Sequence, residues 1–501
     1  MPHKFLNANT AEFSANGTGI PEVDFDIGES YAGQIRIYND TTDKSNLFFW
    51  FFPTINQTAE KEIIIWLNGG PGCSSLMGLM QEHGPFLWQP GVLKPVSNPW
   101  SWHTLTNIVY IDQPVATGYS TGSLTINSSE DAAQQFLSWW KNFVDTFSLQ
   151  GYKIYMAGES YAGMFAPYIA SAMIDSACET YYNISGMFII DPWIAPLELH
   201  TLPDIQFTEY WPGLFPFNES FRAHLQSVDE YCGKSKLISK YLAYPPSGHI
   251  PFSIYPGKDT SFDVETCYST VMEIFEAAIA INPCFDIYHA SQTCPFVYDP
   301  YGGPSVDDDN PPDQDELIYF DRPDVKRALH VPEAIEFVPC SPGVHFANPT
   351  NTDESESSSY KAVPRVIDHT KRVIIAHGAL DSILFANGTL MAIQNMTWGG
   401  VQGFQHRPDR PFYVPDYFIA DQSKVGAGSG VFGSTVSERG LTYVGVDVAG
   451  HEIPQYAPSA AYRIVEFLLG RAACLDCPEG YETEPKDMGN GTAPYGWSRR
   501  G

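Results

Sequence analysis

Six short runs of apolar residues, each followed by a turn-forming segment, most constrain the fold of this chain. They are EIIIWL (62–67), NIVYI (107–111), KIYMA (153–157), GMFII (186–190), RVIIA (372–376) and LTYVGV (441–446). Continuous apolar runs of this length are typical of strands that are buried on both faces of a parallel sheet. We therefore expect such a sheet at the centre of the fold.

Helical stretches alternate with these runs. The stretch 130–147 places Phe136, Trp140, Phe143 and Phe147 on one face at helical spacing, and a second helix is expected over 459–469. Strands that alternate with helices imply an α/β fold in which helices cover both faces of the sheet.

The segment 181–315 breaks this alternation. It is rich in aromatic residues, proline and glycine, and it holds Cys232, Cys267, Cys284 and Cys294. An apolar helix is expected within it, over 269–281. We predict a core in two parts (21–180 and 316–470), a disulfide-stapled cap insertion (181–315) and a C-terminal tail (471–501).

The charge balance excludes some classes of partner. The 501 residues include 28 Lys and Arg against 58 Asp and Glu, a formal net charge of −30. Contacts with nucleic acids and with anionic membranes depend on clusters of Lys and Arg, so neither partner is expected. No segment approaches the roughly 20 consecutive apolar residues of a spanning helix, so stable membrane insertion is not expected. Excess carboxylate also suits work at acidic pH.

Nine sequons and nine cysteines point to the secretory pathway. The sequons begin at Asn16, Asn39, Asn56, Asn127, Asn183, Asn218, Asn387, Asn395 and Asn490. The cysteines show no zinc-site spacing, so disulfides are the better interpretation, and an odd number leaves at least one thiol over. We expect a secreted or vacuolar protein whose leader sequence is not visible in this chain.

The string Gly158-Glu159-Ser160-Tyr161-Ala162-Gly163 follows the third apolar run and precedes a helical stretch. It is typical of the G-x-S-x-G nucleophile elbow, which holds a serine on a sharp strand-to-helix turn. A serine hydroxyl needs a histidine and an orienting acid to become a good nucleophile. Asp381 and His451 follow later runs in the expected order, Ser, Asp, His. His377 is a rival base, but it lies too close in sequence to Asp381 to be preferred.

The string WLNGGPGCSS (66–75) is the most distinctive in the chain. Two adjacent glycines directly after a strand leave backbone N–H groups open to a ligand, which is the expected position of an oxyanion donor. The predicted oxyanion hole is therefore the N–H of Gly70 with the N–H of Tyr161. The alternative is a tight Gly-Pro turn without a catalytic role.

Four motifs together carry a resemblance to a known family. WLNGGPGCSS, DQP (112–114), GESYAG (158–163) and GHEIP (450–454) closely resemble the serine carboxypeptidases of the α/β-hydrolase fold, over about 30–470. The resemblance is to fungal secreted or vacuolar members. It implies a central, mostly parallel sheet with a cap, Ser160 as nucleophile, His451 as base and then acid, and Asp381 as its orienter. It also implies a Cys73–Cys340 disulfide.

The resemblance further implies how a substrate is recognised. Trp66, Asn68, Glu82 and Glu159 would bind the terminal carboxylate of a peptide or protein. Without the resemblance, Glu82 is equally well a solvated loop carboxylate. A close carboxyl pair binds a carboxylate only when protonated, which favours acidic pH, whereas neutral His451 is needed for turnover. A mildly acidic optimum is therefore expected, and no metal or organic cofactor is implied.

Three departures from the family pattern stand out: Ala379 replaces the first Asp of GDxD, Glu452 replaces a Met, and Ala116 replaces a Gly. Glu452 is expected to alter the preference for the leaving residue or to disfavour acidic C-terminal residues. The favoured function is a serine-type carboxypeptidase that acts through an acyl-enzyme. The alternatives are an acyltransferase or esterase on the same scaffold, and a catalytically silent binding protein.

Overall fold

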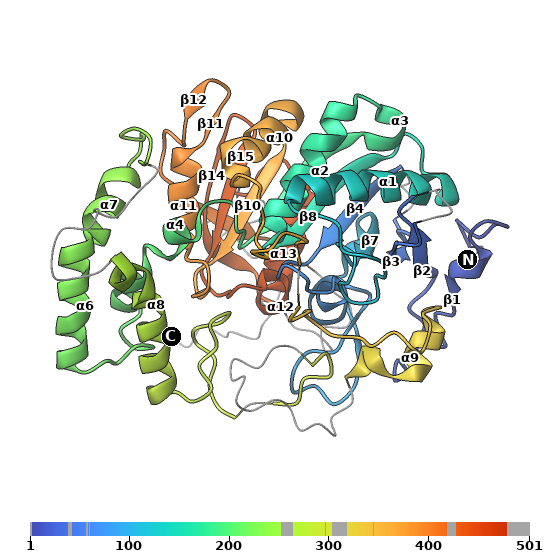
Figure 1. The fold of residues 1–501 in the computed structure, drawn as a ribbon, viewed down its shortest axis with the longest axis horizontal. Coiled ribbons are helices and arrows are strands. Elements are labelled where there is room, and N and C mark those ends of the chain that lie inside the picture. The colour runs from blue at the N-terminus through green and yellow to red at the C-terminus, as the bar shows by residue number, and fades with distance from the viewer. Residues whose placement is uncertain are drawn as a thin grey trace, which may run out of the picture.

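The computed structural model describes residues 3–38, 43–56, 59, 61–251, 264–295, 297–302, 318–343, 345–417 and 427–477 (Figure 1). Its main element is an 11-stranded sheet of order β1-β2-β3-β7-β4-β8-β9-β10-β15-β14-β13. All six predicted runs are strands of this sheet. They are β4 (Glu62–Leu67), β7 (Asn107–Ile111), β8 (Lys153–Glu159), β9 (Ile184–Ile190), β10 (Val373–Gly378) and β15 (Leu441–Val446). These six are neighbours and pair in parallel, which confirms the predicted fold class.

Both edges of the sheet are antiparallel, which the sequence did not predict. One edge consists of β1 (Ser14–Ala15), β2 (Ser30–Arg36) and β3 (Asn46–Phe52), and the other of β14 (Gly430–Glu438) and β13 (Arg410–Val414). The sheet is therefore mixed at its edges and parallel in the middle, where the sequence motifs lie.

Helices cover both faces of the sheet, and the side chains of β4 point alternately toward the two faces. Ile63 and Ile65 belong to one core cluster, and Ile64 and Trp66 belong to the other. The first cluster contains α1 (Ser129–Phe147), α2 (Ala162–Ser176) and α10 (Ala362–Thr370), and the second contains α12 (Ile453–Tyr456) and α13 (Pro458–Leu468). Alternate side chains of a strand point to opposite faces, so an all-apolar strand must be covered twice.

Helix α1 matches its predicted face. Its aromatic residues Phe136, Trp140, Phe143 and Phe147 are all buried in the first cluster. Its N-terminus is capped by the Ser128 side chain, which accepts a hydrogen bond from the Asp131 N–H.

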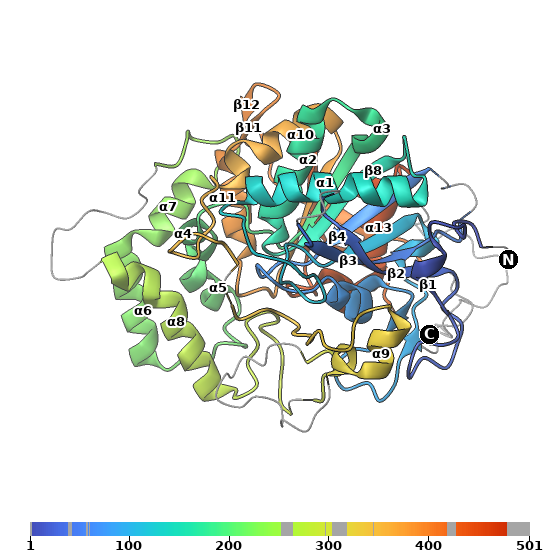
Figure 2. The same cartoon turned by 45° about the vertical axis from the view of Figure 1, so that its right-hand side comes forward.

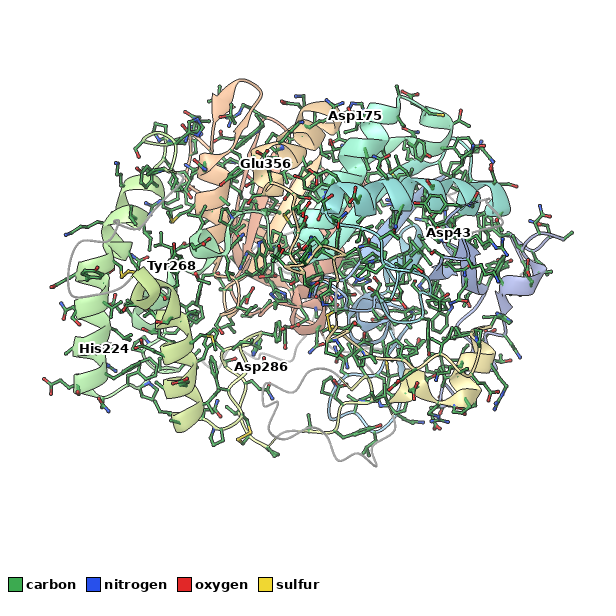
Figure 3. All side chains as sticks on the ribbon, viewed as in Figure 1. Asp43, Asp175, His224, Tyr268, Asp286 and Glu356 are labelled. Carbon is green, nitrogen blue, oxygen red and sulfur yellow. A yellow bond between two sulfur atoms is a disulfide. The ribbon has the colours of Figure 1, made fainter. Side chains whose placement is uncertain are left out.

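The cap lies beside the sheet in both views (Figures 1 and 2). It contains α4 (Leu197–Thr201), α5 (Asp204–Tyr210), α6 (Glu219–Cys232), α7 (Lys234–Tyr241) and α8 (Val264–Ile281). His224 of α6 and Tyr268 of α8 lie on its outer part (Figure 3), and His224 Nε2 is 2.7 Å from Glu273 Oε2 of α8. Strand β9 is part of the sheet although it falls inside the predicted 181–315 segment, so we propose that the cap begins after β9.

Four disulfides join Cys73 to Cys340, Cys232 to Cys267, Cys284 to Cys294 and Cys474 to Cys477. The Cys232–Cys267 bond connects α6 with α8, and the exposed Cys178 is the thiol left over. The remaining α-helices and strands of the described residues are α3 (Glu179–Tyr182), α9 (Pro323–Ala328), α11 (Ala386–Asn395), β5 (Phe86–Leu87), β6 (Val96–Ser97), β11 (Thr397–Trp398) and β12 (Val401–Gln402). No helix among the described residues is long and apolar enough to cross a membrane.

A buried ion pair in the cap gives a test of cap stability. Lys234 Nζ lies 2.6 Å from Asp204 Oδ2, with side-chain exposures of 2% and 1%. Lys234→Met leaves the Asp204 carboxyl buried and unpaired, so we expect it to lower the free energy of unfolding at neutral pH by about 3 kcal/mol. Lys234→Met combined with Asp204→Leu removes both charges and is expected to cost less than about 1 kcal/mol. Urea unfolding of both variants measures the difference, and equal losses would contradict it.

Candidate active site

The ends of four adjacent strands bring the candidate catalytic residues to one edge of the sheet. The Ser160 N–H, after β8, donates to the Ile190 carbonyl of β9 at 3.0 Å. The Asp191 N–H, after β9, donates to the Ala376 carbonyl of β10 at 2.9 Å, and the Ala379 N–H donates to the Val446 carbonyl of β15 at 2.9 Å. Because these strands are parallel, the loops that carry Asp381 and His451 leave the sheet at the same edge as Ser160.

Ser160 lies on a sharp turn between β8 and α2. Its φ is +61°, in the left-handed region that non-glycine residues rarely adopt. Its carbonyl accepts hydrogen bonds from the Gly163 and Trp193 N–H groups, both at 2.9 Å. The fifth position of the motif is Ala162, so the match to G-x-S-x-G is inexact in sequence, but the turn has the geometry of a nucleophile elbow.

Asp381 and His451 are in contact. His451 Nδ1 lies 2.8 Å from Asp381 Oδ2, and both side chains are buried. Burial works to raise the pKa of Asp381, but the two histidines beside it, His451 and His377, outweigh burial and lower the pKa to about 2. Burial works to lower the pKa of His451, but the Asp381 carboxylate outweighs it and the pKa is raised. The acid is therefore ionised and orients the imidazole.

Ser160 and His451 are not hydrogen-bonded to each other in this structure. His451 Nε2 is buried and has no hydrogen-bond partner within the described part of the chain. The Nδ1–H that faces Asp381 leaves Nε2 as the lone-pair nitrogen, which is the tautomer a general base requires. Hydrogen bonds between catalytic side chains are often long or poorly aligned in free enzymes and tighten when substrate binds.

The candidate oxyanion donors lie on the two loops next to Ser160. The N–H groups of Gly70 and Tyr161 have no acceptor among the described residues. The first loop is tied by the Cys73–Cys340 disulfide that the family resemblance implies. The second is held by the Tyr161 hydroxyl, which donates to Asp353 Oδ2 at 2.8 Å.

The side chain of Asn68 is fixed by three hydrogen bonds. Its Oδ1 accepts from Trp66 Nε1–H at 2.7 Å and from the Gly78 N–H at 3.1 Å, so its Nδ2 faces Glu159 Oε1, at 3.2 Å. A Cβ on Gly78 would lie 2.3 Å from Trp66 Nε1, so only glycine fits there. Trp66 is fully buried and its single N–H is used by Asn68. We infer that Trp66 acts through Asn68 and does not bind a substrate directly.

Glu82 and Glu159 form a buried carboxyl pair. Glu82 lies on the short π-helix Gly78–His83 and Glu159 ends β8, and their exposures are 0% and 2%. Burial raises the pKa of Glu82 to about 8, and burial together with the Glu82 charge raises the pKa of Glu159 well above its ordinary value. Neither oxygen of Glu82 accepts a hydrogen bond from another of the described residues, and the two carboxyls can bond to each other only when one of them carries a proton.

The structure shows the surroundings of two residues that depart from the family pattern, Glu452 and Ala116. Glu452 is also buried, and burial raises its pKa to about 8, with Asp286 and Glu82 adding to the effect and His451 opposing it. It therefore adds a third carboxyl to the pair. Asp286 lies where the chain passes between cap and sheet (Figure 3). Ala116 has a φ of +70°, which explains why glycine is usual at this position.

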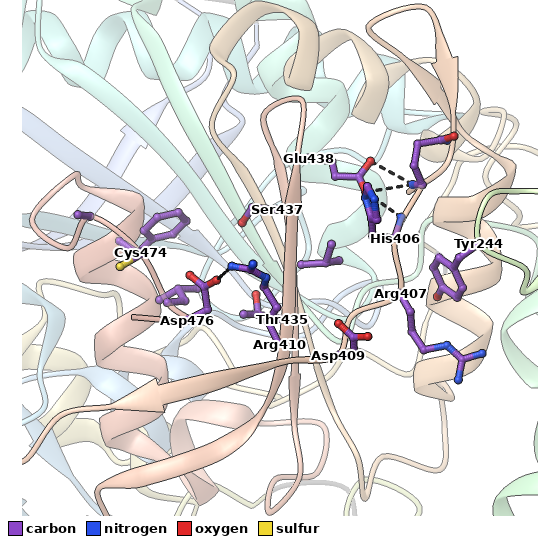
Figure 4. A pocket seen from close by; sticks show the side chains of 15 residues that line it. Tyr244, His406, Arg407, Asp409, Arg410, Thr435, Ser437, Glu438, Cys474 and Asp476 are labelled. Carbon is purple, nitrogen blue, oxygen red and sulfur yellow. Dashed lines mark hydrogen bonds and ion pairs between the residues drawn. The ribbon is translucent and has the colours of Figure 1, made fainter. Parts of the chain in front are cut away.

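A cavity of about 750 Å³ lies elsewhere, beside β13 and β14 (Figure 4). Arg410, His406 and Glu438 are among the residues that line it, and none of the candidate catalytic or carboxylate-binding residues does. The cavity is therefore not the site that the motifs predict.

The fold and this arrangement of residues define an α/β-hydrolase with a Ser–Asp–His constellation beside a buried carboxyl pair. A sequence profile described as serine carboxypeptidase matches residues 21–470. The chain belongs to the serine carboxypeptidase family, whose activity is the release of C-terminal amino acids.

Individual relatives agree with this assignment. The chain is 47% identical to a probable serine carboxypeptidase of Arthroderma benhamiae, over 93% of this chain and 88% of the relative. It is 40% identical to serine-type carboxypeptidase F of Aspergillus niger, over 94% and 89%. The crystal structure of Kex1(Δ)p, a prohormone-processing carboxypeptidase from Saccharomyces cerevisiae, has the same fold, with a TM-score of 0.70 at 22% identity over 94% of this chain and 97% of that one.

The close approach of Gly69 to the elbow gives a test of the site geometry. A Cβ at Gly69 would lie 2.5 Å from the Tyr161 nitrogen and 2.7 Å from Ser160 Cβ. Gly69→Ala must therefore displace the elbow or the loop, and we expect kcat/KM to fall by about 100-fold. Gly213→Ala, where a Cβ meets nothing within 4 Å, is the matched control and should keep full activity. Equal activity of the two variants would contradict the predicted geometry.

Proposed function

We propose that this protein is an exopeptidase in which Ser160 attacks the last peptide bond of a peptide with a free C-terminus. The observation that carries the proposal is the juxtaposition of an Asp381–His451 pair at 2.8 Å with a serine elbow and a buried pair of glutamates at the same edge of the sheet. The first arrangement supports acyl transfer, and the second supports recognition of a terminal carboxyl group.

The chemical steps follow from the free atoms of the site. Ser160 Oγ adds to the scissile carbonyl while His451 Nε2 takes its proton. The oxygen that becomes negative is placed toward the N–H groups of Gly70 and Tyr161. When the intermediate collapses, the C–N bond breaks and the departing amino acid takes the proton from His451. A water molecule then repeats the sequence on the acyl-enzyme and releases the shortened peptide.

Recognition of the terminal carboxylate rests on Asn68, Glu82 and Glu159. When the carboxyl pair holds protons, it donates hydrogen bonds to a substrate carboxylate, and when it loses them, it repels that carboxylate. The raised pKa of Glu82, about 8, means that the donating form persists up to neutral pH. The raised pKa of His451 works against the acidic optimum expected from the sequence, because turnover requires the neutral imidazole.

We also propose passage through the secretory pathway. Among the predicted glycosylation sites, Asn16, Asn218 and Asn387 are exposed, and Asn56, Asn127, Asn183 and Asn395 are partly exposed. Asn39 and Asn490 lie outside the described residues. The four disulfides support the same proposal, because disulfides persist in oxidising compartments.

The decisive test uses an N-blocked dipeptide and its C-terminally amidated version. We expect release of the free amino acid from the acid and not from the amide, because the amide cannot occupy the carboxylate site. Equal processing of both would favour the acyltransferase or esterase alternative. Ser160→Ala is expected to lower kcat by at least about 10⁴-fold.

The same variant distinguishes a catalytic serine from a structural one. The Ser160 hydroxyl makes no hydrogen bond within the described residues, so Ser160→Ala should change the free energy of unfolding by less than about 0.5 kcal/mol. Purified Ser160→Ala that retains peptidase activity would refute the nucleophile assignment. Failure of a serine-directed organophosphate to inactivate the unmodified enzyme would favour the silent homologue.

The pH dependence of KM tests the carboxyl pair. A group with a pKa of about 8 is about one-tenth protonated at pH 9, so KM should rise about tenfold between pH 6 and pH 9. In Glu82→Gln combined with Glu159→Gln, the amides donate at any pH, and KM should vary by less than about twofold over this range. The same alkaline rise of KM in both proteins would rule out the pair as the titrating group.

A further inference from the structure

A second group of buried side chains, Asp191 and His377, lies next to Asp381. We propose that Asp191 and His377 are positioning residues that hold the Asp381 carboxylate and its loop in place for His451. The inference rests on the proposed function of Asp381 and assigns a part to two residues that the sequence motifs do not include.

The cluster comes from two neighbouring strands. Asp191 follows β9 and His377 belongs to β10, and both are fully buried. His377 Nε2 lies 3.2 Å from Asp191 Oδ1 and 3.5 Å from Asp381 Oδ2. Hydrogen bonds between β9 and β10 fix this spacing, because the Asp191 N–H donates to the Ala376 carbonyl at 2.9 Å.

His377 is hydrogen-bonded to the loop that holds Asp381. Its Nε2 donates to the Leu384 carbonyl at 2.5 Å. The N–H groups of Ile383 and Leu384 in turn donate to Asp381 Oδ1, at 2.9 and 3.2 Å. The imidazole therefore fixes the peptide segment whose N–H groups occupy one oxygen of Asp381, which leaves the other oxygen for His451.

Asp191 clamps the strand that carries His377. Its Oδ1 accepts a hydrogen bond from the Gly378 N–H at 2.8 Å. One side-chain nitrogen or oxygen atom from each of Asp191, His377 and Asp381 lies within 4.8 Å of the other two. Two ionised carboxylates this close together repel each other strongly in a buried site. The two carboxyl groups therefore differ in protonation state. Burial and the Asp381 charge raise the pKa of Asp191 well above its ordinary value, whereas Asp381 stays ionised.

A neutral Asp191 has the hydrogen-bonding pattern of an asparagine, one acceptor and one donor. Asp191 Oδ2 has no hydrogen-bond partner among the described residues, so a proton on this oxygen is free to face Asp381. Asp191 also puts a carboxyl near Asp381 in a chain where Ala379 replaces the Asp of the usual GDxD pattern. The supporting group thus comes from the neighbouring strand.

A cavity reaches this cluster from the side of α11. It measures about 350 Å³, and His377, Ala379 and Asn387 are among the residues that line it. His377 Nδ1 is buried and has no hydrogen-bond partner within the described residues. A small solute of the size of imidazole has room in this cavity once the His377 side chain is removed.

The test is a chemical rescue with matched variants. We expect His377→Gly to lower kcat about 100-fold with KM within about twofold, because a misplaced Asp381 affects turnover and not the carboxylate site. Imidazole at tens of millimolar should restore at least a tenth of the lost kcat in His377→Gly. His377→Gln, whose amide keeps a donor near the Nε2 position, should retain more activity than His377→Gly.

The controls separate positioning from general loss of structure. His103 is a partly buried histidine whose Nδ1 lies 2.7 Å from Ser101 Oγ, away from this cluster, and His103→Gln should lower Tm without changing kcat. Imidazole should leave the unmodified enzyme and Ser160→Ala unchanged. Should His377→Gly fail to fold, Asp191→Asn is expected to keep kcat within about twofold and Asp191→Ala to lower it at least tenfold.

Three outcomes would overturn the inference. The first is an unchanged kcat in folded His377→Gly, and the second is a loss of kcat in His377→Gly that imidazole does not reverse. The third is an equal kcat in Asp191→Asn and Asp191→Ala. These results are distinct from failure of the proposed function, which would appear as residual peptidase activity in Ser160→Ala.

Discussion

Backbone hydrogen bonds between β8, β9, β10 and β15 decide where every candidate catalytic group lies. They align the four strands so that Glu159 is opposite Ile190 and Gly378 is opposite Val446. Each of these strands is followed by one residue of the site, namely Ser160, Asp191, Asp381 and His451. These four residues are far apart in the sequence. A change in the register of one strand would separate the serine from its base, so the catalytic arrangement depends on the apolar strands that hold the sheet together.

A second constraint is the number of carboxyl groups buried near this edge. Glu82, Glu159, Glu452, Asp191 and Asp381 are all at most 5% exposed. They cannot all be ionised, because each loses hydration and repels the others. Only Asp381 has its pKa lowered, since two imidazoles face it, and the pKa of each of the others is raised. The site therefore combines one fixed negative charge, used for orienting His451, with neutral acids that donate hydrogen bonds.

The sequence predicted the centre of the fold better than its edges. The runs at 62–67, 107–111 and 441–446 have the bounds of β4, β7 and β15, because strands buried on both faces are continuously apolar. Strand β14 (Gly430–Glu438) contains glycines and polar residues and gives no such signal. The 158–163 and 450–454 strings pointed to Ser160 and His451, whereas the hydrogen bond from Trp66 Nε1–H to Asn68 Oδ1 is visible only in the structure. The sequence motifs do not single out Asp191, although it directly follows a predicted strand, and they present His377 only as a rival base.

The Cys73–Cys340 disulfide joins residues 267 positions apart, and the whole cap lies between them. Ser160 precedes the cap, whereas Asp381 and His451 follow it. If a protease cut the cap once, the two resulting polypeptides would remain covalently linked, and they would still be paired in one sheet through β9 and β10. Nicking would then be visible on a reducing gel and invisible on a non-reducing one, with the parts of the catalytic apparatus divided between the two fragments.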